Sequence, residues 1–250
     1  MFKKLALALI VAAALPASAL TTGDIAFTTF NADEDGLSFV ALTGIAANTT
    51  VFFSDNEWNG SAFNTGESYS QWVSGGNAIA AGTVVRLKDY DKSTPSASVG
   101  TLSRVSVSGS ANWGIANSTE TVYAYLGTVS SPGTFLAAVT NGNFAVDGSL
   151  TGTGLTQGIN AIRLNALVPS ATPDFAEYTG ARSGLASFGA YLPLLANAAN
   201  WTVDTTNGTY TTTAPNLTAF TVTSVPEPET YALMLAGIGA LGLLIKRRRG

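Results

Sequence analysis

Acidic and aromatic side chains gather between residues 55 and 72 of the sequence. The stretch contains Asp55, Glu57, Trp58, Phe63, Glu67, Tyr69 and Trp72. Aromatic faces stack on sugar rings, and two carboxylates about 5 to 10 Å apart can hydrolyse a glycosidic bond. Loop aromatics more often pack over the end of a sheet. Packing is therefore the first expectation, with glycan contact through Asp55, Glu57, Trp58 and Trp72 and glycoside hydrolysis as alternatives.

A second oxygen-rich stretch, residues 31–36, matches the first half of a calcium loop. Asn31, Asp33 and Asp35 alternate as oxygen ligands, and a glycine follows at the sharp turn. The twelfth position, where such a loop uses a bidentate glutamate, is Leu42. A solvated hairpin tip between two strands explains the same residues. We therefore expect no cofactor and keep a calcium ion as the alternative.

The chain of 250 residues contains no histidine and no cysteine. Ser-His-Asp triads, Cys-His pairs, His-ligated zinc and disulfides are therefore all unavailable. The commonest general base near neutral pH is missing as well. We expect the protein not to be an enzyme.

Charge is scarce and unevenly placed. Only 11% of the residues are charged, against about 25% in typical soluble domains. Residues 20–225 hold fourteen acidic and six basic side chains, a net charge of −8; the terminal segments add six cations and two glutamates, which brings the whole chain to −4. An acidic body without a basic patch is unsuited to binding nucleic acid.

The elements that must position these residues are short strands. Segments rich in β-branched and aromatic residues with a period near two alternate with turn sequences such as Asn59-Gly60 and Asn141-Gly142. This pattern predicts an all-β fold, an antiparallel β-sandwich, over residues 20–222. We expect strands at 24–30, 37–43, 49–54, 83–87, 101–107, 121–126, 134–140 and 161–164.

One helical region is expected near residue 190. Leu185, Phe188, Leu192 and Leu195 follow a 3,4,3 spacing that gathers them on one helical face. Pro193 falls inside this pattern and would break or restart the helix. The sequence therefore predicts one or two short helical turns covering an end or edge of the sheets.

The first nineteen residues are typical of a signal peptide. Lys3 and Lys4 precede an apolar run, and the small residues Ala17 and Ala19 fit signal peptidase, so we expect cleavage after Ala19. A permanent membrane anchor is the alternative, but the run is short and ends at Pro16.

The C-terminal segment has three parts in a fixed order. Pro226, Glu227 and Pro228 form a stiff spacer within residues 223–230, because two prolines preclude helix and central strand. Residues 231–245 carry no charge; as a helix they would reach about 22 Å, which snorkelling and membrane thinning can extend across a bilayer. The cations Lys246, Arg247, Arg248 and Arg249 should stay in the cytoplasm. We therefore expect a transmembrane helix with a basic tail over 231–250, and the body on the far side of the inner membrane.

This ordered trio resembles the PEP-CTERM sorting signal. The resemblance implies recognition of the Pro-Glu-Pro element by an exosortase, and a Gram-negative bacterium that makes extracellular polysaccharide. The segments Gly23–Phe27, Phe39–Trp58 and Ala199–Thr202 resemble an uncharacterised β-rich domain of exported bacterial proteins. That second resemblance implies a sandwich of the lamin-tail type and assigns no catalytic residues.

The sequence thus predicts an exported protein of the cell surface or extracellular matrix, associated with exopolysaccharide. Its expected partners are signal peptidase, an exosortase, the inner membrane during transit, and extracellular polysaccharide. Two alternatives stay open. One is a carbohydrate-active enzyme or lectin that uses residues 55–72, and the other is an adhesin or self-assembling protein that pairs through its edge strands.

Overall fold

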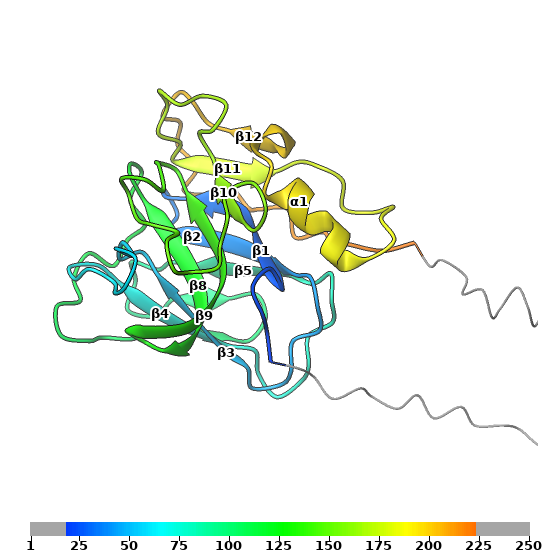
Figure 1. The fold of residues 1–250 in the computed structure, drawn as a ribbon, viewed down its shortest axis with the longest axis horizontal. Coiled ribbons are helices and arrows are strands. Elements are labelled where there is room, and N and C mark those ends of the chain that lie inside the picture. Colours follow the sequence, from blue (N-terminus) through cyan, green and yellow to red (C-terminus); the bar gives the residue numbers. More distant parts are fainter. Residues whose placement is uncertain (1–18, 224–250) are drawn as a thin grey trace, which may run out of the picture.

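Two six-stranded sheets face one another in this protein (Figure 1). The structure is a computed structural model and describes residues 19–223. All strand pairs are antiparallel except the parallel pair β9 and β10. The expected β-sandwich is confirmed as an architecture of two sheets with short helices at one side.

The first sheet has the strand order β12-β11-β1-β2-β5-β6. Its strands are β12 (Trp201–Val203), β11 (Phe175–Tyr178), β1 (Ile25–Asn31), β2 (Gly36–Ala41), β5 (Val84–Lys88) and β6 (Ser96–Ala97). Every residue of β1 and β2 is buried, so other parts of the chain cover both faces of these central strands.

The second sheet has the strand order β10-β9-β8-β3-β4-β7. Its strands are β10 (Ala161–Arg163), β9 (Ser131–Thr140), β8 (Thr121–Thr128), β3 (Thr50–Ser54), β4 (Tyr69–Val73) and β7 (Thr101–Arg104). The register of β3 and β8 places Ser54 opposite Tyr123. This pairing determines which acidic residues meet at the end of β3.

An aromatic core joins the two sheets. Phe39 of β2 meets Trp72 of β4 edge to face at 5.2 Å between ring centroids, and Phe27 of β1 meets Phe53 of β3 at 6.3 Å. The indole of Trp72 is completely buried and donates a hydrogen bond to the carbonyl of Val99 at 2.7 Å. Burying an aromatic side chain removes a large apolar area from water, so these contacts stabilise the sandwich.

A second aromatic cluster covers the outer face of the second sheet. Phe63, from the loop between β3 and β4, contacts Tyr123 and Tyr125 of β8 and Phe135 of β9. Trp58 of the same loop lies 5.1 Å from Phe135, and its indole donates to the carbonyl of Thr151 at 2.9 Å. The loop aromatics therefore form a satellite core under their own loop.

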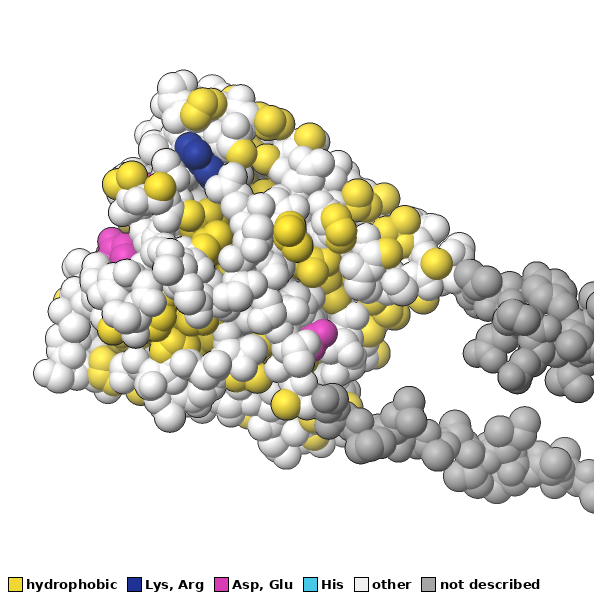
Figure 2. Space-filling model, viewed as in Figure 1, with side chains coloured by type: hydrophobic (Ala, Val, Ile, Leu, Met, Phe, Trp, Pro, Cys, Tyr) yellow, Lys and Arg dark blue, Asp and Glu magenta, His cyan; other side chains and the backbone are white. Residues whose placement is uncertain are grey.

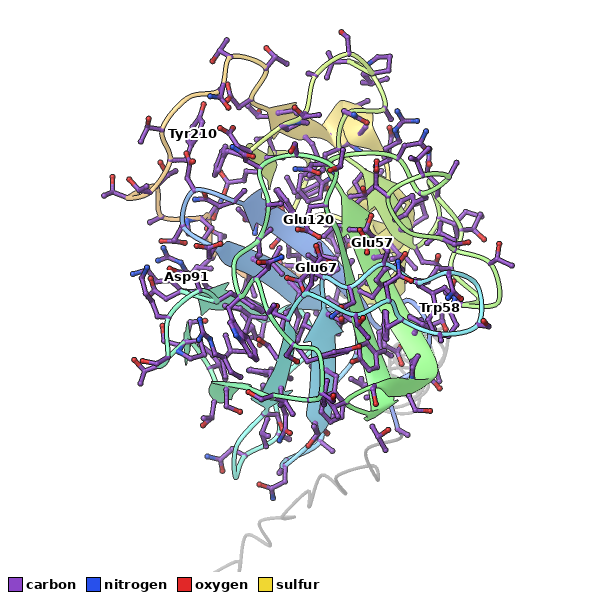
Figure 3. The ribbon with its side chains drawn as sticks, turned by 90° about the vertical axis from the view of Figure 1, so that its left-hand side faces the viewer. Glu57, Trp58, Glu67, Asp91, Glu120 and Tyr210 are labelled. Atoms are coloured by element: carbon purple, nitrogen blue, oxygen red, sulfur yellow. The ribbon has the colours of Figure 1, made fainter. Side chains whose placement is uncertain are left out.

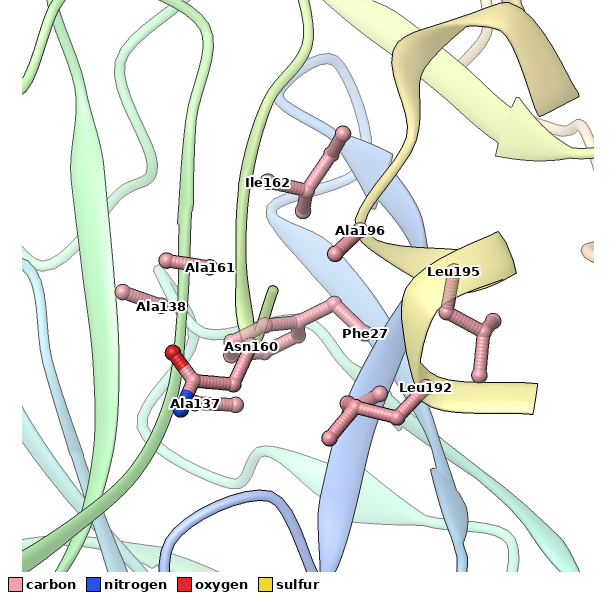
Figure 4. Close-up of a pocket in the computed structure, with 10 residues that line it drawn as sticks. Phe27, Ala137, Ala138, Asn160, Ala161, Ile162, Leu192, Leu195 and Ala196 are labelled. Carbon is pink, nitrogen blue, oxygen red and sulfur yellow. The ribbon is translucent and has the colours of Figure 1, made fainter. Parts of the chain in front are cut away.

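Three short helices lie beside the first sheet: η1 (Phe188–Tyr191), α1 (Leu192–Leu195) and η2 (Ala198–Asn200). Pro193 stands at the start of α1, where a missing backbone N–H disturbs nothing, so the expected restart is confirmed. Leu192 and Leu195 close α1 against Phe27 and Ile162 (Figure 4). The gap left there has a volume of about 10 Å³, room for at most one water molecule.

The last described residues form a strap, residues 216–223, across the first sheet and the helical region. The backbone N–H of Phe220 donates to the carbonyl of Gly82, that of Thr221 to Arg182 and that of Thr223 to Leu185, at 2.8 to 2.9 Å. The ring of Phe220 is buried. The strap therefore fixes the point from which the C-terminal segment leaves the body.

The two terminal predictions fall almost wholly outside these residues. The signal peptide covers residues 1–19, of which only Ala19 is described, and the transmembrane helix covers 231–250. Within residues 19–223, no helix is long and apolar enough to cross a membrane.

Candidate functional site

The acidic residues of the 55–72 stretch lie at one end of the second sheet. Asp55 follows β3 directly and is only 3% exposed. Its carboxyl group accepts hydrogen bonds of 2.8 Å from the backbone N–H and the hydroxyl of Ser68. Burial raises the pKa of Asp55 to about 8, against the effect of these bonds.

Two further carboxyl groups join Asp55 in what we call the acidic cluster, Asp55, Glu67 and Glu120. Figure 3 labels Glu67 and Glu120. Burial raises the pKa of Glu120 to about 9, and the charge of Asp55 adds to the shift. Burial, with the charge of Glu57, raises the pKa of Glu67 to about 7. Glu120 accepts hydrogen bonds from the backbone N–H groups of Ala116 and Thr121. Burial therefore favours the protonated, neutral forms of Asp55 and Glu120.

Of the three carboxyl groups, Asp55 borders a closed gap, whereas Glu67 is partly exposed. The gap next to Asp55, lined in part by Phe53, Tyr90 and Ile115, has no room for a water molecule. A general acid needs substrate within hydrogen-bond reach. Asp55 therefore has no room for a substrate in this gap.

The four residues weighed for glycan contact lie in different environments. Trp72 belongs to the core between the sheets, and Trp58 is 8% exposed with its rings against Phe63 and Phe135. Neither ring offers a free face on which a sugar could stack. Asp55 is buried, and Glu57 alone of the four is partly exposed. The packing that the sequence favoured for this loop is what the structure contains.

The residues weighed as calcium ligands point to different partners. Asn31 donates to the carbonyl of Tyr210, while Asp33 accepts from the backbone N–H of that tyrosine. Asp35 accepts from the backbone N–H of Ile115 at 2.6 Å. These side chains tie the β1–β2 hairpin to two distant loops. In residues 19–223, no three His, Cys, Asp or Glu side chains form a group suited to a metal ion.

A further pair of carboxyl groups was not indicated by the sequence pattern. Asp174 precedes β11 and lies beside Asp204, which follows β12. Burial and the neighbouring carboxyl group raise the pKa of Asp174 to about 6. The antiparallel pairing of β11 and β12 brings these residues together from thirty positions apart, so no local signal could have found them.

The surface around these sites carries little charge. Figure 2 shows a face made mostly of uncharged polar and apolar side chains. Several cationic side chains form ion pairs within the body: Arg86 pairs with Glu34, and Lys88 pairs with Asp89. The face in Figure 2 therefore shows few charged side chains.

The fold defines an all-β domain of two sheets over residues 19–223. Residues 224–249 match the PEP-CTERM protein-sorting motif. The match includes Pro226, Glu227 and Pro228 and the cations Lys246, Arg247, Arg248 and Arg249, all outside the described residues. The motif makes this an exported protein with a C-terminal sorting signal, processed by an exosortase and destined for the cell surface or the exterior.

No curated protein matches the chain, and no solved structure matches it either. The likeness of the body to domains of the lamin-tail type therefore stays a prediction. The same holds for cleavage after Ala19 and for the transmembrane helix over 231–250.

Proposed function

We propose that the protein is a non-catalytic component of the cell surface or extracellular matrix that associates with the exopolysaccharide of a Gram-negative cell. The observation that carries the proposal is the sorting motif at residues 224–249, joined to a low-charge sandwich. The closed gap beside Asp55 supports the non-catalytic part, because a substrate could not reach this carboxyl group there.

Association with polysaccharide can be tested in the producing cell. The tagged full-length chain should appear outside the inner membrane and co-sediment with the extracellular polysaccharide. Enzymatic removal of the polysaccharide should release it. Recovery of the protein in a polysaccharide-free fraction before such treatment would contradict the proposed association.

Hydrolysis needs a separate test, since the alternative was a glycosidase built on Asp55, Glu57 or Glu67. The purified full-length chain should release no reducing sugar from the polysaccharide of its own cells. Release that disappears in Asp55→Asn, Glu57→Gln or Glu67→Gln would establish the enzyme instead.

Self-assembly through edge strands gains little support from the described sheets. The edge strands β6, β7, β10 and β12 contain only two to four residues each. Short edges offer few unpaired backbone groups to a second chain. We therefore retain the surface or matrix protein as the conclusion.

A further inference from the structure

An open groove lies beside the edge of the second sheet, formed by residues other than the acidic cluster. It has a volume of about 260 Å³ and is lined by Gln157, Gly158, Arg163, Leu167, Pro193 and Asn197, together with three alanines. Pockets for drug-sized ligands measure about 300 to 1,000 Å³. The groove is therefore of a size for one small polar ring.

Arg163 is held in place at one side of its guanidinium group. Its Nε donates to Oδ1 of Asn165 at 2.7 Å, and the Nδ2 of Asn165 donates to the carbonyl of Ala171 at 2.9 Å. Asn165 is 4% exposed, so this support is fixed within the fold. The two terminal Nη atoms of Arg163 donate to nothing in residues 19–223.

The other five cations of the body all have partners. Arg86, Lys88 and Lys92 pair with carboxylates. Arg104 donates to the carbonyl of Tyr90 and lies over the ring of Trp113, and Arg182 donates to the carbonyl of Thr218. Within the described residues, Arg163 differs from these five cations: its guanidinium group is held in place at Nε, and its two Nη atoms face a groove without a hydrogen-bond partner.

The remaining lining residues suit a ligand that has hydroxyl groups. Gln157 and Asn197 are exposed, and no carboxylate lines the groove. Gln157 offers its amide and Asn197 its Nδ2, since Oδ1 of Asn197 accepts from the backbone N–H of Ala199. Leu167 is 67% exposed and, with Pro193, supplies apolar surface. One cation, two amides and a small apolar wall match a sugar ring that carries a carboxylate.

We propose that this groove binds an acidic sugar unit, with the sugar carboxylate on the Nη atoms of Arg163. The inference deepens the proposed function, and depends on it, by naming the class of saccharide recognised. A guanidinium end binds a carboxylate through two parallel hydrogen bonds, which a lysine cannot reproduce. Because the body has a net charge of −8, its overall field repels anions, and the attraction must come from this single pairing.

The test is a titration of the purified full-length chain in detergent with glucuronic acid, glucose and acetate, followed by calorimetry or NMR. Glucuronic acid should bind saturably and more tightly than either comparator. Arg163→Ala should weaken that binding by roughly tenfold to a hundredfold, and Arg163→Lys should recover only part of it. Lys88→Ala removes the same charge elsewhere and should leave binding unchanged.

A second variant tests the groove independently, in case Arg163→Ala fails to fold. Gln157→Glu changes an exposed side chain and places a competing carboxylate in the groove, so it should also weaken glucuronic acid binding. Equal binding by the parent chain and both variants would overturn the proposal, as would equal affinity for acetate or no saturation in the parent chain. If Arg163→Ala still co-sediments with polysaccharide, the groove assignment fails while the proposed function stands; loss of co-sedimentation by the parent chain would defeat the function itself.

Discussion

At the scale of single residues, the acidic cluster couples folding to protons. In the folded state the pKa values of Asp55, Glu67 and Glu120 rise to about 8, 7 and 9, above their ordinary values near 4. Between about pH 4 and pH 9, the folded protein therefore binds more protons than the unfolded chain. The stability contributed by the protonated cluster is complete below about pH 4 and is lost as the pH rises through 7 to 9.

We expect the thermal midpoint of the full-length chain to fall between pH 5 and pH 9. Asp55→Asn replaces the carboxyl group by a neutral amide, whose oxygen can still accept a hydrogen bond from Ser68. It should therefore stabilise the protein at pH 9 by a few kcal/mol, order of magnitude, with a smaller effect at pH 5. Unfolding monitored by circular dichroism across this range checks the prediction. Asp89→Asn, at a partly exposed site, is the control, and parallel curves for parent chain and Asp55→Asn would contradict the coupling.

Trp72 provides a second prediction at this scale. Trp72→Ala should lower the free energy of unfolding by about 3–5 kcal/mol, because the change leaves a cavity between the sheets and frees the Val99 carbonyl. Trp113, which is only partly buried, supplies the matched control. Urea titrations of Trp72→Ala and Trp113→Ala measure the difference. Similar losses in both variants would show that the intersheet contact is unimportant.

The sequence showed part of the acidic cluster and could not show the rest. Asp55 and Glu67 fall in one stretch of chain, so their proximity was foreseeable. Glu120 lies near Asp55 because β8 pairs with β3, and the local pattern of residues does not show which strands pair. The sequence also could not show that Asp55 is buried, since burial depends on loops packed from elsewhere.

At the scale of elements, the sequence predicted eight of the described strands, including the fully buried β1 and β2, and missed β4, β6, β11 and β12. Most expected segments differ from the observed strands by a few residues at their ends. β4 was assigned to a loop because its residues fall in the stretch of mixed acidic and aromatic side chains; in the structure Tyr69 enters the outer cluster and Trp72 the core. β6 and β12, with two and three residues, are too short to show an alternation of apolar and polar residues.

The connection between β6 and β7 carries the chain from the first sheet to the second. Gly100 lies in it at φ +77°, and a Cβ there would come within 2.3 Å of the Val73 carbonyl oxygen. Gly100→Ala should therefore destabilise the protein by several kcal/mol. Gly184 has φ +94° and open space around it, so Gly184→Ala should lose only about 1–2 kcal/mol. Equal midpoints in urea for the two variants would refute this view of the crossing.

At the scale of the whole molecule, the terminal segments were the easiest part to interpret. A charge cluster, an apolar run and a proline pair are linear features whose meaning does not depend on the fold. The match over residues 224–249 bears this out for the sorting signal. The role of the body depends on surfaces assembled from distant residues, such as the Arg163 groove, and was beyond sequence patterns.

The sorting element gives a prediction for the full-length protein in its cell. Replacing Pro226, Glu227 and Pro228 together by Ala, Gln and Ala should block processing and leave the uncut chain in the inner-membrane fraction. Pro215→Ala, outside the motif, should be processed normally. Immunoblots of fractionated cells distinguish the two forms. Normal export of the triple variant would show that the element is not what the exosortase recognises.

The strap at residues 216–223 determines how the body responds to tension. A pull applied at its far end reaches Thr223 first, then Thr221, then Phe220, because their bonds to Leu185, Arg182 and Gly82 follow one another along the chain. Bonds loaded in series break singly and at small force. The strap would therefore detach before the strands of either sheet separate, and the sandwich would stay folded.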